Sequence, residues 1–180
     1  MPLSIRTERL TLCQWQPDHF PSFAEHLTDA QAMRFLGGTR SFSEASRIFL
    51  SLAGQWQLRG YGFYAVEHEG RFVGAVGIFH PYNWPEPELA YNFVSEVHGR
   101  GFATEAVRAV RNVAAMQGRE RLVSFIDPEN HASEAVARRL GAEPIGDTSF
   151  NAETVTVWRH QMSADAVPPR QSVGELEPVS

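Results

Sequence analysis

The chain has 180 residues, of which 43% are hydrophobic and 21% charged, a composition that fits one globular domain with a real core. Its formal net charge of −5 argues against a nucleic-acid binder that relies on phosphate contacts. The single cysteine, Cys13, excludes an intrachain disulfide and a multi-cysteine metal site, and the sequence has no signal segment and no membrane-length apolar run. We therefore expect a cytoplasmic protein with no metal, no nucleic-acid partner and no membrane partner.

The first third of the chain carries one strand pattern and two helix patterns. Residues 7–15 alternate well enough to predict a first strand, with Leu10 and Leu12 on one face and Thr11, Cys13 and Trp15 on the other. A helix opens at Pro17, and its apolar stripe runs to Leu27. Ser41 with Glu44 matches a capping box, so a second helix begins there and ends near residue 60. The aromatic side chains of this region are most simply core.

The middle of the chain is rich in strands. Two strands, over 61–66 and 72–79, flank a turn at 67–70 and predict a hairpin. The following loop, 80–87, contains prolines and aromatic residues, and it either walls a substrate pocket or covers a sheet edge. A further alternating strand occupies 88–94.

The most informative stretch follows this strand and contains Gly99 and Gly101, after which apolar residues recur at helical spacing. A strand that runs through Gly-x-Gly into a helix leaves unpaired backbone N–H groups at the positive end of the helix dipole, which suits a phosphate. The sequence contains neither the P-loop motif nor the third glycine of the dinucleotide-binding motif. Taken alone, the two glycines are also explained by a tight turn.

The last part of the chain predicts a strand over 121–126, a helix over 132–140, and strands over 143–146 and 153–160. From residue 164 onward the sequence has almost no core-forming pattern. We therefore expect one domain over 1–163 and a mobile tail over 164–180.

The order of these elements resembles the GNAT N-acetyltransferase superfamily, in particular the branch of ribosomal-protein N-terminal acetyltransferases. The resemblance covers most of the chain and depends on four segments, residues 7–12, 88–91, 98–106 and 130–141. It implies an α/β (α+β) acyl-CoA N-acyltransferase fold, with a mixed central sheet of about six to seven strands, splayed at the cofactor site, and about four helices. Glu96 and Ala90 depart from the family pattern.

The resemblance implies transfer of an acetyl group from acetyl-coenzyme A to a primary amine, by direct attack in a ternary complex. The pyrophosphate would bind the backbone over the glycine turn, and the pantetheine arm would pair with the strand before it. The residues that the resemblance assigns to the cofactor are Phe93, Val94, His98, Gly99, Arg100, Gly101, Phe102, Ala103, Thr104, Asn130 and Ser133.

Three residues are the catalytic candidates. By resemblance, Ser133 hydrogen-bonds or protonates the leaving thiolate, and Asn130 contacts the cofactor or an ordered water; the competing interpretation makes Asn130 a helix N-cap and Ser133 a first-turn residue. Glu88 is placed to accept the amine proton, or is merely a strand residue. We expect Tyr91 to be core, and we assign no covalent role to Cys13.

The acceptor remains open at this point. It is either a protein or peptide N-terminus, which needs an open groove, or a small amine such as a polyamine, which favours a closed acidic pocket. The alternative from another class is a non-catalytic acyl-coenzyme A sensor with the same fold. The sequence is compatible with a monomer or a homodimer.

Overall fold

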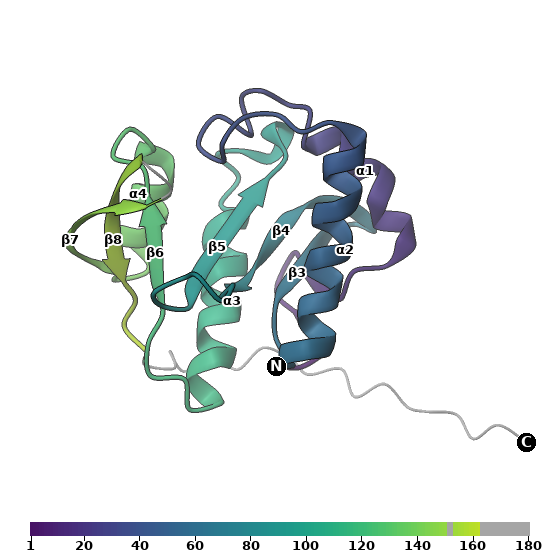
Figure 1. The fold of residues 1–180 in the computed structure, drawn as a ribbon. Coiled ribbons are helices and arrows are strands. Elements are labelled where there is room, and N and C mark those ends of the chain that lie inside the picture. The colour runs from purple at the N-terminus through teal and green to yellow at the C-terminus, as the bar shows by residue number, and fades with distance from the viewer. Residues whose placement is uncertain (151–152, 163–180) are drawn as a thin grey trace, which may run out of the picture.

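The computed structural model describes residues 1–150 and 153–162. They form a mixed sheet with α1 and α2 on the near face and α3 on the far face (Figure 1). The expected tail, 164–180, lies outside the described residues.

The sheet has eight strands in the order β1-β2-β3-β4-β5-β6-β8-β7. Their bounds are β1 Ser4–Arg6, β2 Thr11–Cys13, β3 Phe63–His68, β4 Arg71–Phe79, β5 Glu88–Phe93, β6 Val123–Ile126, β7 Glu143–Phe150 and β8 Glu153–Arg159. Neighbouring strands are antiparallel except for β5 and β6, which are parallel. The expected fold class is confirmed, although the sheet has more strands than expected.

The helices follow the expected order. They are α1 Phe20–His26, α2 Phe42–Arg59, α3 Phe102–Met116 and α4 His131–Arg139, with short 3-10 turns at η1 Pro17–His19 and η2 Ser95–Val97. The capping box of Ser41 and Glu44 forms as predicted, and Gly60 ends α2 in the left-handed conformation.

Two local predictions need correction. Residues 7–15 are not one strand, because the chain turns between β1 and β2, where the Thr7 N–H donates to the Leu10 carbonyl at 2.9 Å. This turn supplies the additional strand. The hairpin turn is also shorter than 67–70: β3 continues to His68, and Glu69 and Gly70 make the turn with φ of 52° and 73°.

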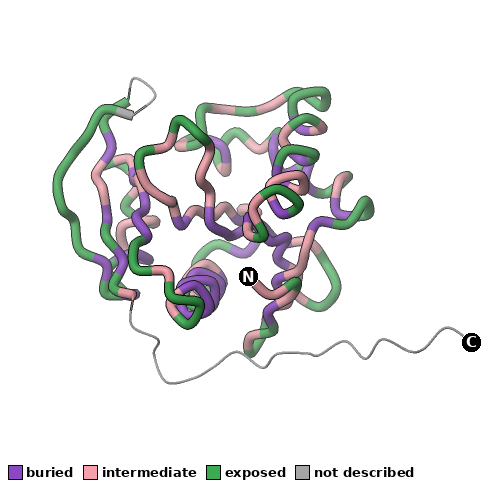
Figure 2. The backbone as a smooth tube through the Cα atoms, turned by 60° about the horizontal axis from the view of Figure 1, so that its bottom comes forward, coloured by how far each residue is buried: buried purple, intermediate pink, exposed green. Residues whose placement is uncertain are grey.

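The interior is divided into a large and a small hydrophobic cluster. The large one lies between the sheet and α1, α2 and α3, and the small one joins β6, β8 and α4 through Ile126, Ala137, Ala142 and Trp158. Figure 2 shows the buried residues concentrated inside the molecule, with exposed residues on its outer turns. Within the described residues, no helix combines the length and the apolar character needed to cross a bilayer. The large cluster also includes Leu122, just before β6, and Val136 and Leu140 at α4, so α4 contributes to both clusters.

Candidate active site

A groove of about 930 Å³ opens where β5 and β6 part. In the described chain these strands pair only through Glu88 and Val123, and beyond this pair they diverge (Figure 1). The groove is lined by residues of β5, β6, α4, the start of α3 and the segment over 31–36. Its carboxylates and arginines are balanced: Glu8, Glu88, Glu105, Asp127, Arg9, Arg34, Arg108 and Arg139.

The glycine turn forms one end of the groove. Gly99 and Gly101 have φ of 76° and 80°, in the left-handed region that glycine adopts without strain. Gly101 is the N-cap of α3, and in the described part of the chain no side chain caps this helix. The first N–H groups of α3 thus remain available to a ligand at the positive end of the helix dipole. The predicted cofactor residues that line the groove here are His98, Gly99, Gly101, Phe102, Ala103 and Thr104.

Two predicted cofactor residues, Val94 and Arg100, are not among the residues that line the groove. The Val94 N–H donates to the Val73 carbonyl at 3.0 Å, on the β4 side of the strand. The Arg100 guanidinium carbon lies 4.6 Å from the centre of the Phe102 ring. Cofactor contacts of these two residues stay a prediction.

The edge of β5 that faces the groove belongs to Leu89, Tyr91 and Phe93. Backbone groups in an antiparallel pair alternate in direction, and Val94 points toward β4. In agreement with this alternation, the Leu89 carbonyl accepts from Ser124 Oγ at 2.6 Å and the Phe93 carbonyl accepts from His98 Nε2 at 2.9 Å. The backbone of Tyr91 and the amide of Phe93 therefore lie on the edge available to a strand-like ligand.

Glu88 occupies the vertex of the groove, at the last paired position of β5 and β6. Burial raises the pKa of its carboxyl group to about 7, against the opposing effect of hydrogen bonds from the Trp84 indole and the Phe125 backbone. The Trp84 Nε1 donates to Glu88 Oε2 at 2.8 Å. The loop over 80–87 does not line the groove, but through Trp84 it reaches the candidate base. A carboxyl group with this pKa is suited to proton transfer near neutral pH.

The start of α4 forms the opposite wall. Asn130 is the N-cap of this helix, and its Oδ1 accepts from the Ser133 N–H at 3.1 Å. Both residues line the groove. The structural role considered for Asn130 is therefore present, and it does not exclude a second role for its amide group, because Oδ1 alone makes the cap.

Tyr91 was expected in the core, but it is half-buried and lines the groove. Its hydroxyl donates to the Ser133 carbonyl at 3.5 Å, and burial raises its pKa to about 12. The alternation along β5 correctly placed Tyr91 on the same face as Leu89 and Phe93. Local sequence does not show that β6 moves away beside it.

Sequence reasoning also missed side chains from distant segments. Arg9 and Glu105 line the groove and form an ion pair of 2.7 Å between Nε and Oε2. Arg34 and Glu129 form a longer and more exposed pair of 3.2 Å between the segment before α2 and the loop before α4. Such pairs have no local signature, because their partners lie more than 90 residues apart.

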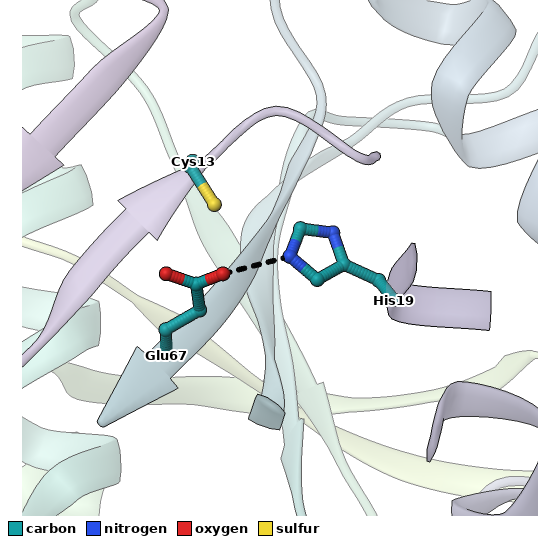
Figure 3. A group of neighbouring side chains, drawn as sticks. All are labelled: Cys13, His19 and Glu67. Atoms are coloured by element: carbon teal, nitrogen blue, oxygen red, sulfur yellow. Dashed lines mark hydrogen bonds and ion pairs between the residues drawn. The ribbon is translucent and has the colours of Figure 1, made fainter. Parts of the chain in front are cut away.

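A separate cluster joins Cys13, His19 and Glu67 outside the groove (Figure 3). The Gln16 N–H donates to His19 Nδ1 at 3.0 Å, so the ring proton is on Nε2, which donates to Glu67 Oε1 at 2.9 Å. A metal at Nε2 would require the proton on Nδ1, opposite the Gln16 N–H. Burial, followed by the charge of Glu67, raises the pKa of Cys13 to about 11, so the thiol stays protonated. These hydrogen bonds make the cluster structural.

Comparisons with known proteins agree with the geometry. A family model described as an acetyltransferase (GNAT) domain matches residues 9–143. An acetyltransferase from Agrobacterium tumefaciens is 30% identical with a TM-score of 0.79, over 89% of this chain and 95% of that chain.

Two further solved structures share the fold at lower identity. The ribosomal L7/L12 alpha-N-protein acetyltransferase RimL, in complex with coenzyme A, is 21% identical with a TM-score of 0.75, over 90% of this chain and 99% of that chain. The microcin C7 self-immunity acetyltransferase MccE, in complex with acetyl-CoA and AMP, is 14% identical with a TM-score of 0.71, over 86% of this chain and 93% of that chain. On the extent of the family match, the chain belongs to the GNAT acetyltransferase family.

Proposed function

We propose that this protein transfers the acetyl group of acetyl-coenzyme A to a primary amine, by direct attack in a ternary complex. The observation that carries the proposal is the joint presence, in one groove, of an uncapped helix start and a half-buried carboxyl group with a pKa of about 7. The first suits an anionic donor and the second suits removal of a proton from the acceptor.

The groove has chemistry that fits coenzyme A. The first N–H groups of α3 are suited to the pyrophosphate, and Arg9 and Arg108 line the groove at the same end. The free edge of β5 at Tyr91 and Phe93 is suited to the amides of the pantetheine arm. In this placement the thioester lies toward the vertex, between Glu88 and α4.

Two proton transfers accompany the reaction. Glu88 takes the proton from the attacking amine, directly or through a water. Ser133 remains the candidate that hydrogen-bonds to the departing thiolate or protonates it, so that coenzyme A leaves as the thiol, and Asn130 caps the helix that carries Ser133. Tyr91, whose hydroxyl lies at the Ser133 carbonyl, is a further neutral donor on this wall.

The acceptor that best fits the site is an α-amino group, such as a peptide N-terminus. The groove is open and its charges are balanced, whereas a polyamine favours a closed acidic pocket. The pKa of Glu88, about 7, is also close to that of an α-amino group, about 7.7–8.0, and far from the value of about 10.4 for an alkyl amine. The proton transfer is therefore better matched to an α-amine.

The test combines cofactor binding with an acceptor panel. Saturating acetyl-coenzyme A should raise the Tm, because it binds the folded state. The panel holds peptides with a free N-terminus, the same peptides with a blocked N-terminus and a free lysine, and a polyamine, with products identified by mass spectrometry. We expect acetylation of the free N-termini. An unchanged Tm and no binding by calorimetry would refute the proposal, and binding without turnover on any amine would favour the sensor.

A further inference from the structure

The turn between β1 and β2 docks onto the first turn of α3, although the two segments are far apart in the sequence. Thr7 Oγ1 donates to Glu105 Oε1 at 2.5 Å, and the Arg9 backbone N–H donates to the same oxygen at 2.9 Å. The Arg9 Nε donates to the other oxygen, Oε2, at 2.7 Å. Both oxygens of Glu105 are thus held by this turn. Glu105 is therefore directed back to Arg9 and not toward the start of its own helix.

The Arg9 guanidinium, which binds Glu105, also binds the backbone of the glycine turn. Its Nη1 donates to the Arg100 carbonyl at 2.9 Å. This carbonyl belongs to the same peptide unit as the Gly101 N–H, and in a trans peptide the two groups point in opposite directions. Fixing the carbonyl oxygen on Arg9 therefore also fixes the direction of the Gly101 N–H.

The glycine turn needs such a restraint. Gly99 and Gly101 flank Arg100, and both have positive φ. Glycine reaches these values without strain, but the same freedom allows the intervening peptide units to flip. A flipped unit would present a carbonyl oxygen, instead of an N–H, to an anion at the start of α3. The unit between Gly99 and Arg100 is held within the turn, because the Arg100 N–H donates to the Val97 carbonyl at 3.3 Å. The unit between Arg100 and Gly101 is held from outside it, by the bond from Arg9 to the Arg100 carbonyl.

We propose that Arg9, held by Glu105, is a positioning residue that fixes the peptide unit between Arg100 and Gly101 in the orientation that binds the coenzyme A pyrophosphate. This inference rests on the proposed function, because it concerns the same cofactor site. The planar guanidinium is required, since one side chain must reach Glu105 through Nε and the Arg100 carbonyl through Nη1. Lysine carries the same charge but cannot make both bonds in this geometry.

Arg9→Lys separates this role from simple attraction of a cation to phosphate. We expect the Kd of coenzyme A, measured by calorimetry, to rise about tenfold, equivalent to about 1.4 kcal/mol. The KM for acetyl-coenzyme A should rise while kcat stays close to wild type, because only binding is affected. The control is Arg6→Ala, at an exposed arginine of β1, which should bind as wild type. Wild-type affinity in a folded Arg9→Lys protein would overturn the inference.

Glu105→Gln gives a test in which two explanations predict opposite signs. Removing a carboxylate beside a phosphate site should strengthen coenzyme A binding if electrostatic repulsion alone matters. If Glu105 acts by holding Arg9, the same change should weaken binding severalfold, and the apo Tm shows whether the fold is kept. Tighter or unchanged binding would contradict the proposal, and this variant keeps the test decisive if Arg9→Lys does not fold. If the wild type itself does not bind coenzyme A, the proposed function fails, and this inference fails with it.

Discussion

The starts of α2 and α3 show two ways in which a helix N-terminus is completed. At α2, Ser41 Oγ accepts from the Glu44 N–H and the Glu44 carboxylate accepts from the Ser41 N–H, so the helix satisfies its own donors locally. At α3, a glycine takes the N-cap position, and the acidic residue of the first turn, Glu105, bonds to Thr7 and Arg9 instead. The first arrangement adds stability to the helix, whereas the second leaves the first amides of α3 without a side-chain cap.

Among the substitutions that test this contrast between the two helix starts, Gly101→Val should have the largest effect, because it changes the N-cap of α3 itself. A β-branched side chain resists the φ of 80° found at Gly101 and places methyl groups beside the Arg9 guanidinium, which lies 3.5 Å from the position of a Cβ. We expect coenzyme A affinity, measured by calorimetry, to fall by about a hundredfold or more, since the turn can no longer direct its amides to the phosphate; this corresponds to about 2.8 kcal/mol.

The matched control is Gly60→Val at the end of α2. Gly60 also has a positive φ, of 68°, with open space at the position of a Cβ. This variant should lose stability without losing affinity in its folded fraction. Equal affinities for Gly101→Val and wild type would mean that the glycine turn is not the pyrophosphate site.

The next effect in size concerns Glu88. Glu88→Gln should lower the rate on an α-amine acceptor by about a hundredfold near pH 7, because a base is lost, and higher pH should partly restore it as the amine deprotonates. In the wild type the rate should rise through pH about 7, the pKa of Glu88. Steady-state rates across pH check both statements, with Glu25→Gln, at an exposed glutamate of α1, as the control. If Glu88→Gln reacted at the wild-type rate at every pH, Glu88 would not be the general base.

Glu88→Gln, which should lower the rate, should raise the stability of the folded protein. Burial raises the pKa of Glu88 in the folded protein from 4.5 to about 7, so the folded state favours the protonated form. The associated stability is present below pH about 4.5 and is lost as the pH rises through about 7. Glu88→Gln should therefore be more stable than wild type above pH 7, by on the order of 1–3 kcal/mol, and the difference should vanish near pH 4. Urea unfolding at both pH values measures it.

The features that depend on short stretches of sequence could be predicted from the sequence alone. The capping box of α2, the glycine turn and the order of strands and helices all follow from periodicity, capping residues and glycine positions. The family resemblance then supplied the splay between β5 and β6, for which periodicity gives no signal.

The remaining features depend on contacts between distant residues. Residues 7–9 directly precede the alternating stretch at Leu10 and join it in one predicted strand, but the Thr7 hydroxyl and the Glu105 carboxylate stabilise a turn there. Glu88 could be named from the sequence, whereas its pKa arises from burial and from Trp84 and Phe125. Tyr91 has the pattern of a core residue and lines the groove only because β6 diverges.

The smallest expected effects concern the helix caps and separate the two interpretations of Asn130. Ser41→Ala removes the cap of α2, and Asn130→Ala removes the cap of α4, in which Oδ1 accepts from the Ser133 N–H. Each should lower the free energy of unfolding by about 1 kcal/mol, the usual cost of losing such a cap. Denaturant unfolding measures both, and two similar values make the variants a matched pair.

Coenzyme A binding and turnover should then distinguish Ser41→Ala from Asn130→Ala. Ser41 lies at the start of α2 and is not among the groove residues, so Ser41→Ala should bind coenzyme A and turn over as wild type. Asn130 lines the groove beside Ser133, so Asn130→Ala should also raise the KM for acetyl-coenzyme A or lower kcat by severalfold. Because the stability loss is shared, a difference in kinetics measures what Asn130 does for the cofactor. Identical kinetics in the two variants would make Asn130 a helix cap and nothing more.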